Sequence, residues 1–260
     1  MDLVERQYSE HIARLSLNRP DQRNALSIDM CDAIAAAIDE VDSRRGIRVV
    51  VLSGSGEVFC AGADLSAVSG PHAGDFIRPF ERMLEKVARC RVPAIAVIQG
   101  AALGGGLQLA TACDFRIATE TATLGIPSSR LGIVVNFENV RRLALLAGLS
   151  VAKEILMAGR TYSGEEAHAE GLVNDSVDAA LLDETAAEWA SRIASLAPLS
   201  VEGAKRSLTV VADHMSDARR VAPADVEALD ALVRDAYASA DLAEGLAALR
   251  AKRSASFTGR

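Results

Sequence analysis

The chain has 260 residues, half of them hydrophobic and 24% charged, which is the composition of a globular protein with one sizeable core. Its formal net charge is −7, and this excess of acidic residues argues against nucleic acid or a membrane surface as a partner. An anionic small ligand remains open because it needs only a local basic patch, which arginine would supply since lysine is scarce.

The cysteines and the N-terminal residues indicate the cellular compartment. The four cysteines show no spacing typical of a metal site, and each lies among apolar residues (Cys31, Cys60, Cys90 and Cys113). We therefore expect buried free thiols, no metal ion and a reducing compartment. The first six residues are charged and lack the apolar segment of a secretory signal. Together these features predict a cytoplasmic protein.

Strand-like and helix-like patterns alternate along the first hundred residues. Residues 11–17 alternate between apolar and polar side chains, and residues 47–52 form a continuous apolar run typical of a buried strand. Between them, Ser27 can cap a helix whose apolar residues recur at helical spacing. The other elements predicted here are a polar turn at 18–24, a mobile loop at 66–78, a helix at 78–89 and a strand at 94–98.

Residues 92–113 carry no charge over 22 positions, a length that would be sufficient to cross a membrane. Pro93 and the glycines interrupt this stretch, and its pattern changes halfway from strand-like to helix-like. We therefore interpret it as a strand, a turn and a helix, and we expect no membrane partner.

The rest of the chain continues the alternation and then becomes helical. Residues 115–118 return to a strand pattern, and Ser163 to Glu166 have the spacing of a capping box for a short helix that ends at Gly171. From Leu181 onward the chain is alanine-rich and helical in pattern. The sequence predicts the α/β fold class, with residues 1–195 as the core and residues 196–260 as a helical C-terminal region.

Two glycine-rich stretches, Phe59–Leu65 and Gln99–Gln108, each follow a strand-like run. Glycine permits backbone conformations that aim N–H groups at a ligand, and a helix N-terminus adds unpaired N–H groups. Two such turns can stabilise a thioester oxygen as it becomes an enolate. Tight packing alone is the alternative interpretation of either stretch. A phosphate-binding P-loop and a dinucleotide-binding fingerprint are both excluded, because their consensus residues are absent.

Several motifs occur in order along the chain: Asn18-Arg19-Pro20, Asn24-Ala25-Leu26, FCAGADL, GAALGGGLQLATACD, Leu131-Gly132-Ile133, Gly171-Leu172-Val173 and the tail from Lys252 to Gly259. This ordered set, spread over about residues 10–258, resembles the enoyl-CoA hydratase/isomerase (crotonase) superfamily. The resemblance implies a crotonase-like spiral of ββα repeats with a C-terminal helical trimerisation region. It also implies a homotrimer, or a dimer of trimers, as the assembly.

The resemblance implies a binding site for an acyl-CoA thioester, whose carbonyl oxygen would lie in an oxyanion hole formed by the N–H groups of Ala63 and Gly105. The further ligand-binding positions that it implies are Arg23, Ala25, Leu26, Ala61, Asp64, Leu65, Gly104, Pro127, Leu131 and Asn136. Coenzyme A would be part of the ligand, so no separate cofactor is expected. Arg23 and the Lys252–Arg253 tail are candidate partners for its phosphates, because cationic side chains pair well with them. Solvated surface charges are the alternative.

The catalytic positions of the family are occupied by neutral residues. Its hydratases add water with two glutamates, and those positions here hold Gln108 and Ser128. Other branches place an acid where this chain has Asn136. A carboxamide cannot accept a proton at neutral pH, and a serine needs a neighbouring base. Glu138 is the nearest carboxylate in this segment and a candidate base, with a solvated glutamate as the alternative.

Two hypotheses follow from the retained oxyanion motif and the missing glutamates. In the first, the protein is an enzyme of fatty-acid or other acyl-CoA metabolism that converts a thioester through an enolate, with Glu138 or a loop residue as base. Ordinary hydration is not expected, since general acid–base catalysis is worth roughly 10²–10⁴ in rate. In the second, the protein is a non-catalytic acyl-CoA-binding protein or partner subunit.

Overall fold

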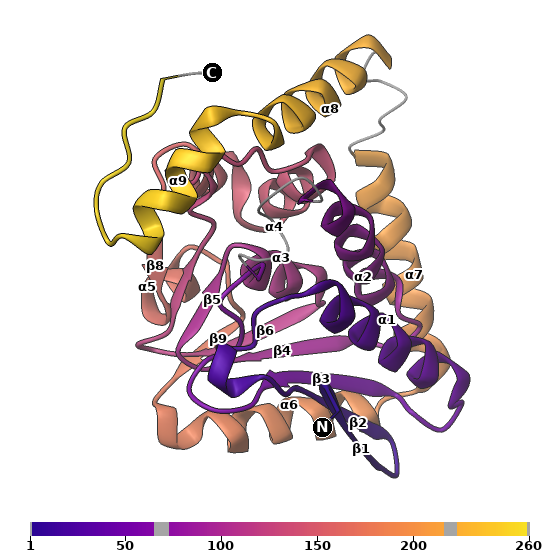
Figure 1. Ribbon diagram of the computed structural model, residues 1–260. Helices are drawn as coiled ribbons and strands as arrows, with labels where there is room; N and C mark the ends of the chain where they lie inside the picture. Colours follow the sequence, from indigo (N-terminus) through magenta and orange to yellow (C-terminus); the bar gives the residue numbers. More distant parts are fainter. Residues whose placement is uncertain (1, 65–72, 216–222, 259–260) are drawn as a thin grey trace.

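The computed structural model describes residues 2–64, 73–215 and 223–258, which form a strand-rich core and a helical C-terminal part (Figure 1). The strands are β1 (Val4–Ser9), β2 (Ile12–Leu17), β3 (Val49–Gly54), β4 (Ala94–Ile98), β5 (Ala101–Leu103), β6 (Phe115–Thr119), β7 (Thr123–Gly125), β8 (Thr161–Ser163) and β9 (Asp175–Val177). The α-helices are α1 (Ile28–Ser43), α2 (Ile77–Arg89), α3 (Gly105–Ala112), α4 (Phe137–Leu156), α5 (Gly164–Ala169), α6 (Leu182–Ser195), α7 (Pro198–Met215), α8 (Pro223–Tyr237) and α9 (Ala240–Arg250).

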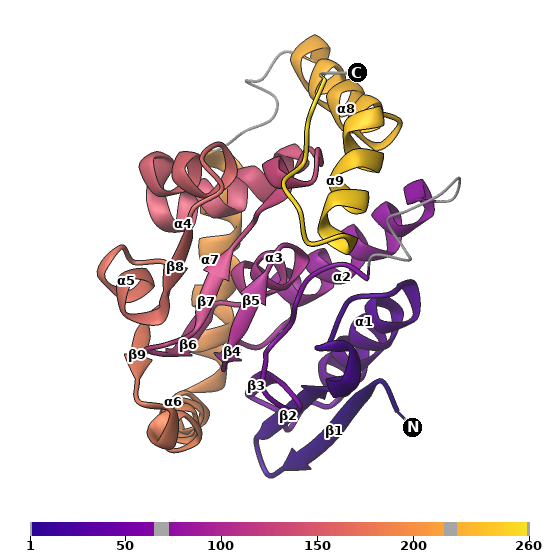
Figure 2. The ribbon, with the colours of Figure 1, turned by 60° about the vertical axis from the view of Figure 1, so that its left-hand side comes forward.

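The strands form two sheets that are linked by successive ββα units. The larger sheet has the order β1-β2-β3-β4-β6-β9, and the smaller one has the order β5-β7-β8. In the chain, β4 is followed by β5 and α3, and β6 is followed by β7 and α4. Each of these units therefore contributes one parallel strand to each sheet. Figure 2 shows the two sheets as adjacent layers.

The larger sheet is buried on both faces, which explains the continuous apolar runs of β3 and β4. Along β3, Val50 and Leu52 contact the main core beneath α1 and α2, whereas Val49 and Val51 contact a second core beneath α6. Figure 1 shows α6 on one side of this sheet and α1–α3 on the other. A strand covered on both faces needs apolar residues at consecutive positions, as the sequence predicted for residues 47–52.

The three C-terminal helices occupy two places. The α7 helix packs against the core, where Lys205 Nζ donates to the Val92 carbonyl at 2.9 Å and to Asp114 Oδ2 at 2.7 Å. The α8 and α9 helices lie across the end of the molecule opposite β1 (Figure 1). The predicted boundary between residues 195 and 196 falls in the turn between α6 and α7.

Most of the predicted elements are confirmed, and the missed ones are the long helix α4 and strands that are short or at an edge. Ser27 Oγ accepts the N–H of Met30 and caps α1, and Ser163 forms the predicted capping box with Glu166. The uncharged stretch 92–113 is divided into β4, β5 and α3. Sequence reasoning missed α4, the edge strand β1 with its mostly exposed side chains, and the three-residue strands β5, β7, β8 and β9. Short or exposed strands lack a clear apolar period.

Other predictions concern the thiols, the membrane and the loop. All four cysteines are buried and free, and burial raises the pKa of each thiol to about 12 (Cys31, Cys60, Cys90 and Cys113). Among the helices described, none is both long and apolar enough to cross a membrane. The loop predicted at 66–78 lies largely outside the described residues; its end forms a 3-10 turn, Ala73–Phe76, and the start of α2.

Candidate functional site

The two glycine-rich stretches meet through backbone hydrogen bonds. The Cys60 N–H donates to the Ala101 carbonyl at 2.9 Å, and the Leu103 N–H donates to the Cys60 carbonyl at 3.0 Å. A Cβ atom at Gly106 would lie 2.3 Å from the Cys60 carbonyl oxygen, so this contact requires glycine. The close packing proposed as the alternative function of glycine is therefore real, and it brings the two turns together.

The N–H groups of Ala63 and Gly105, called here the donor pair, are outside the backbone hydrogen-bond ladder. Ala63 forms an isolated parallel β-bridge with Leu26. In this bridge the Leu26 N–H donates to the Gly62 carbonyl and the Asp64 N–H donates to the Leu26 carbonyl, each at 2.8 Å. Gly105 is the first residue of α3, where N–H groups have no intrahelical acceptor. A Cβ atom at Gly105 would lie 3.4 Å from the Ala63 nitrogen, so the two donors are neighbours.

The donor pair faces a cavity of about 830 Å³. Its walls are mostly apolar and come from α2, α3, the segment 126–139 and the C-terminal helices α8 and α9. The predicted site residues that line it are Arg23, Ala25, Ala61, Ala63, Asp64, Gly104, Gly105, Gln108, Pro127, Ser128, Leu131 and Asn136. Leu26 is fully buried beside it, and Leu65 lies outside the described residues. Mostly apolar walls with a few polar groups are typical of a ligand pocket.

Gln108 and Ser128, the two residues expected from the resemblance to replace glutamates, both lie in this cavity. Both side chains are nearly buried, at 9% exposure. Within the described residues, the Gln108 carboxamide has no hydrogen-bond partner, so its donors and its acceptor remain available to a ligand. Neither of these two side chains carries a carboxylate.

The predicted candidate Glu138 does not reach this cavity. Its side chain is half exposed, and Glu138 Oε2 accepts from Arg141 Nε at 2.8 Å. It lines a second, more polar cavity of about 720 Å³ between α2, α4 and α7. The first turn of α4 directs Glu138 away from the donor pair, because Asn136 and Asn139, on the neighbouring face, line the first cavity.

A different carboxylate, Glu81 of α2, lines the cavity of the donor pair. The Asn136 carboxamide holds it: Asn136 Oδ1 accepts the Asn139 N–H at 3.0 Å and caps α4, while Asn136 Nδ2 donates to Glu81 Oε1. We call these two residues the Glu81–Asn136 pair. Burial raises the pKa of Glu81 above its ordinary range. The residue expected to be only a neutral replacement for an acid therefore supports an acid from another helix.

Sequence reasoning missed Glu81, although a signal was present. Ile77, Phe80 and Leu84 form an apolar stripe on α2, and Glu81 interrupts this stripe at helical spacing. A carboxylate within an apolar stripe is either solvated by bending outward or held in a cavity. Only the positions of α4 and α8 decide between these outcomes.

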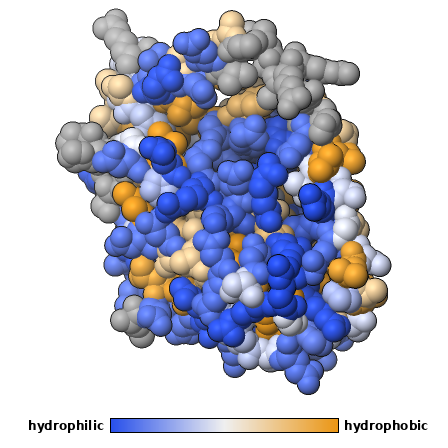
Figure 3. All heavy atoms as spheres, turned by 90° about the vertical axis from the view of Figure 1, so that its right-hand side faces the viewer, coloured by the Kyte–Doolittle hydropathy of each residue, from blue (hydrophilic) through white to orange (hydrophobic). Residues whose placement is uncertain are grey.

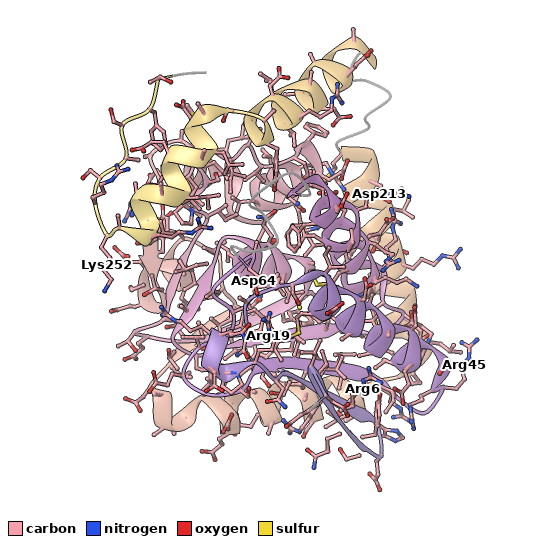
Figure 4. The ribbon with its side chains drawn as sticks, in the orientation of Figure 1. Arg6, Arg19, Arg45, Asp64, Asp213 and Lys252 are labelled. Atoms are coloured by element: carbon pink, nitrogen blue, oxygen red, sulfur yellow. The ribbon has the colours of Figure 1, made fainter. Side chains whose placement is uncertain are left out.

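The other charged residues at the cavity have separate roles. Asp64 pairs with Arg19 at 3.1 Å, and Figure 4 shows the two side chains next to each other near the middle of the molecule. Arg23 is exposed at the cavity, and Arg130 Nη2 donates to the Gly159 carbonyl at 2.7 Å. Lys252, on the C-terminal tail, does not line the cavity.

Comparisons with known proteins agree on one family. The sequence model described as "Enoyl-CoA hydratase/isomerase" matches residues 7–260. A probable enoyl-CoA hydratase of Rhizobium meliloti is 36% identical over 255 residues, which cover 96% of this chain and 95% of that protein. The crystal structure of an enoyl-CoA hydratase/carnithine racemase from Magnetospirillum magneticum is 34% identical, with a TM-score of 0.79 and coverage of 100% and 97%.

A second solved structure is informative because it is a complex with a coenzyme A compound. It is described as methylmalonyl-CoA decarboxylase in complex with 2-nitronate-propionyl-CoA, is 25% identical, and has a TM-score of 0.89 with 99% of each chain covered. Both structural matches extend over essentially the whole chain. They confirm the predicted fold class, a crotonase-like α/β spiral with C-terminal helices.

Proposed function

The chain belongs to the enoyl-CoA hydratase/isomerase family, and on that premise we propose that it binds acyl-CoA thioesters with the thioester oxygen between the N–H groups of Ala63 and Gly105. The observation that carries the proposal is the donor pair itself, two adjacent N–H groups that face a largely apolar cavity. A partly negative oxygen is the ligand that two converging N–H donors suit best.

The cavity suits the remaining parts of such a ligand. Its apolar walls, which include Phe80, Ile126 and Val135, would surround the acyl chain. The guanidinium groups of Arg23 and Arg130 supply positive charge at the same cavity, as the phosphates of coenzyme A require. The methylmalonyl-CoA decarboxylase structure supports this proposal, since that protein of the same fold holds a propionyl-CoA analogue.

The chemistry that we propose proceeds through an enolate in acyl-CoA metabolism, such as that of fatty acids. Two hydrogen bonds to the thioester oxygen stabilise the negative charge that develops when a proton leaves the α-carbon. The stabilisation is greater in the enolate than in the bound thioester, because the oxygen carries more charge there. Ordinary hydration is not part of the proposal, because Gln108 and Ser128 occupy the positions of its two glutamates.

A second candidate is a catalytically silent acyl-CoA-binding protein or partner subunit. It is favoured by the neutral residues at the three usual acid positions, Gln108, Ser128 and Asn136. The two candidates share the binding site and differ in turnover. A thioester that binds without any exchange of its α-proton would favour the silent binder.

The assembly and location that we propose follow from the family and from surface and thiol chemistry. The side of the molecule seen in Figure 3 is mostly hydrophilic, with separate hydrophobic patches. The α7 helix exposes several large apolar side chains: Leu199, Leu208, Val210, Val211 and Met215. Contact between copies would bury them, which supports a homotrimer or a dimer of trimers. The buried free cysteines suit the reducing cytoplasm.

Calorimetric titration with butyryl-CoA tests the proposed binding. A matched pair of variants isolates one donor: Gly105→Ala adds a Cβ and keeps the N–H, whereas Gly105→Pro adds a Cβ and removes the N–H. Proline is well tolerated at the first position of a helix. We expect the Kd of Gly105→Pro to be about tenfold higher than that of Gly105→Ala, the value of one hydrogen bond. Equal affinities, or no binding by the unchanged protein, would contradict the proposal.

A further inference from the structure

Glu81 lines the same cavity as the donor pair, and it also lines the second cavity. The preceding residue, Phe80, packs against the N-terminus of α3: a Cβ atom at Gly105 would lie 3.2 Å from Phe80 Cε2. Both Phe80 and Glu81 line the cavity. The α2 helix therefore contributes a carboxylate to the wall of the cavity that the donor pair faces.

The orientation of Glu81 is set by Asn136. Because Asn136 Oδ1 accepts the N–H of Asn139 as the cap of α4, the carboxamide nitrogen faces Glu81 and donates to its Oε1. In the part of the chain that the structure describes, this is the one hydrogen bond to the Glu81 carboxylate. Oε2 therefore remains able to accept a proton from a bound ligand.

The surroundings of Glu81 favour reversible proton transfer. Burial is the largest influence and raises the pKa of Glu81, with smaller increases from Glu138 of α4 and Asp230 of α8. Arg142 of α4 and the Asn136 hydrogen bond lower the pKa in part. Tyr237 of α8 also lines the cavity, and its own pKa is raised by burial and by Glu81. A carboxyl group with a raised pKa is a stronger base than an ordinary glutamate.

We infer that Glu81, positioned by Asn136, is the catalytic base that removes the α-proton of the bound acyl-CoA; this inference rests on the proposed thioester site. The bond between the α-carbon and its hydrogen breaks, and the proton passes to the Glu81 carboxylate. The electron pair moves onto the thioester oxygen, which the donor pair stabilises as an enolate. The proton then returns from Glu81 to carbon, so that no oxidant, metal or second reactant is consumed.

One base of this kind fits a particular class of substrate. In a 3-enoyl thioester, loss of the α-proton gives a dienolate, and return of the proton to the γ-carbon moves the double bond from C3–C4 to C2–C3. The transfer needs one group that accepts and then donates the same proton. Hydration needs a second group to activate water, and Gln108 and Ser128 cannot supply it without a base. The site therefore selects double-bond migration in acyl-CoA esters over addition of water.

Hydrogen–deuterium exchange at the α-carbon of butyryl-CoA tests the inference on the 260-residue chain. The rate is followed in D₂O by mass spectrometry at saturating thioester, and Kd is measured separately by calorimetry. Glu81→Gln keeps the shape and the acceptor for Asn136 but cannot take the proton. We expect its exchange rate to fall by about 10²–10⁴, with Kd changed by less than about threefold.

Two control variants distinguish Glu81 from other carboxylates. Glu85→Gln changes the exposed glutamate one turn further along α2, which pairs with Arg89, and Glu138→Gln changes the carboxylate of the second cavity. Both should exchange within about threefold of the unchanged protein, because neither side chain lines the cavity of the donor pair, and the influence of Glu138 on the pKa of Glu81 is smaller than that of burial. The exchange rate of the unchanged protein should also fall as the pH decreases through the raised pKa of Glu81. The residual exchange of Glu81→Gln should not show this pH dependence.

Each other outcome overturns the inference in an identifiable way. If Glu81→Gln binds butyryl-CoA and exchanges at the unchanged rate, Glu81 is not the base, while the proposed binding function stands. An equal loss with Glu138→Gln would assign the base to α4 instead. Binding without exchange by the unchanged protein would establish the silent binder. Absence of binding would remove the proposed function and the inference together.

Discussion

The donor pair and the Glu81–Asn136 pair face one cavity, but the chain builds them differently. The donor pair is backbone: its two turns lie within about fifty residues and are joined by hydrogen bonds around Cys60. The Glu81–Asn136 pair is made of side chains from α2 and α4, 55 positions apart in sequence. A backbone site tolerates side-chain replacement around it, whereas a side-chain site changes with each substitution. If our proposal is correct, this difference explains how the backbone site can be kept while the acid comes from another element.

The largest effect expected from this comparison is a gain of hydration. The double variant Gln108→Glu with Ser128→Glu introduces two carboxylates into the cavity. If the donor pair stabilises the thioester oxygen whichever acid is present, these carboxylates should support hydration. Both positions line the cavity, so the new groups would reach a ligand. We expect hydration of crotonyl-CoA to increase by about 10²–10⁴ over the unchanged protein, measured by loss of enoyl absorbance.

The single variants serve as controls for this gain, since each restores one carboxylate and should give much less activity. A folded double variant that binds butyryl-CoA without hydrating crotonyl-CoA would show that the cavity has been reshaped around Glu81. The donor pair and the Glu81–Asn136 pair would then not act independently of each other.

A smaller effect is expected when the support of Glu81 is removed and the helix cap is kept. Asn136→Ser retains an oxygen that can accept the Asn139 N–H, because serine is a good N-cap residue. The shorter serine side chain does not provide the amide donor to Glu81. We expect α-proton exchange to fall about tenfold, the value of one hydrogen bond, with the free energy of unfolding changed by less than about 1 kcal/mol.

Measurement of both quantities on the same preparation separates positioning from folding. Loss of stability together with exchange would mean that Asn136 acts as a cap alone. Unchanged exchange would mean that Glu81 holds its orientation without Asn136.

The sequence indicated the two turns that carry the donor pair and missed the Glu81–Asn136 pair, for physical reasons. Glycine stretches after strands specify local backbone geometry, so the two turns could be located from the sequence, and the resemblance to the family pointed to Ala63 and Gly105 within them. Glu81 looked like one charge on an amphipathic helix, since its partner on α4 and the cover from α8 depend on long-range packing. For the same reason Glu138, near the motif in sequence, was a wrong guide to the cavity, because the helical turn points it elsewhere.

The smallest effect concerns stability and pH. Since burial raises the pKa of Glu81, the folded protein favours the neutral carboxyl, and this contribution to stability is lost as the pH rises through the raised pKa. Glu81→Gln removes the charge, so it should be more stable than the unchanged protein at pH 7–8. The two should become equal below about pH 4, where an ordinary glutamate is protonated. Urea unfolding at several pH values measures the difference, and an unchanged or opposite trend would contradict a buried charge at Glu81.

A structure of this chain with bound butyryl-CoA tests most directly whether the donor pair and the Glu81–Asn136 pair act on one ligand. The expected complex has the thioester oxygen within about 3 Å of both the Ala63 and the Gly105 nitrogen. A Glu81 carboxylate oxygen should then lie about 3–3.5 Å from the α-carbon, on the side of its proton. A thioester oxygen bound elsewhere, or an α-carbon out of reach of Glu81, would contradict this arrangement.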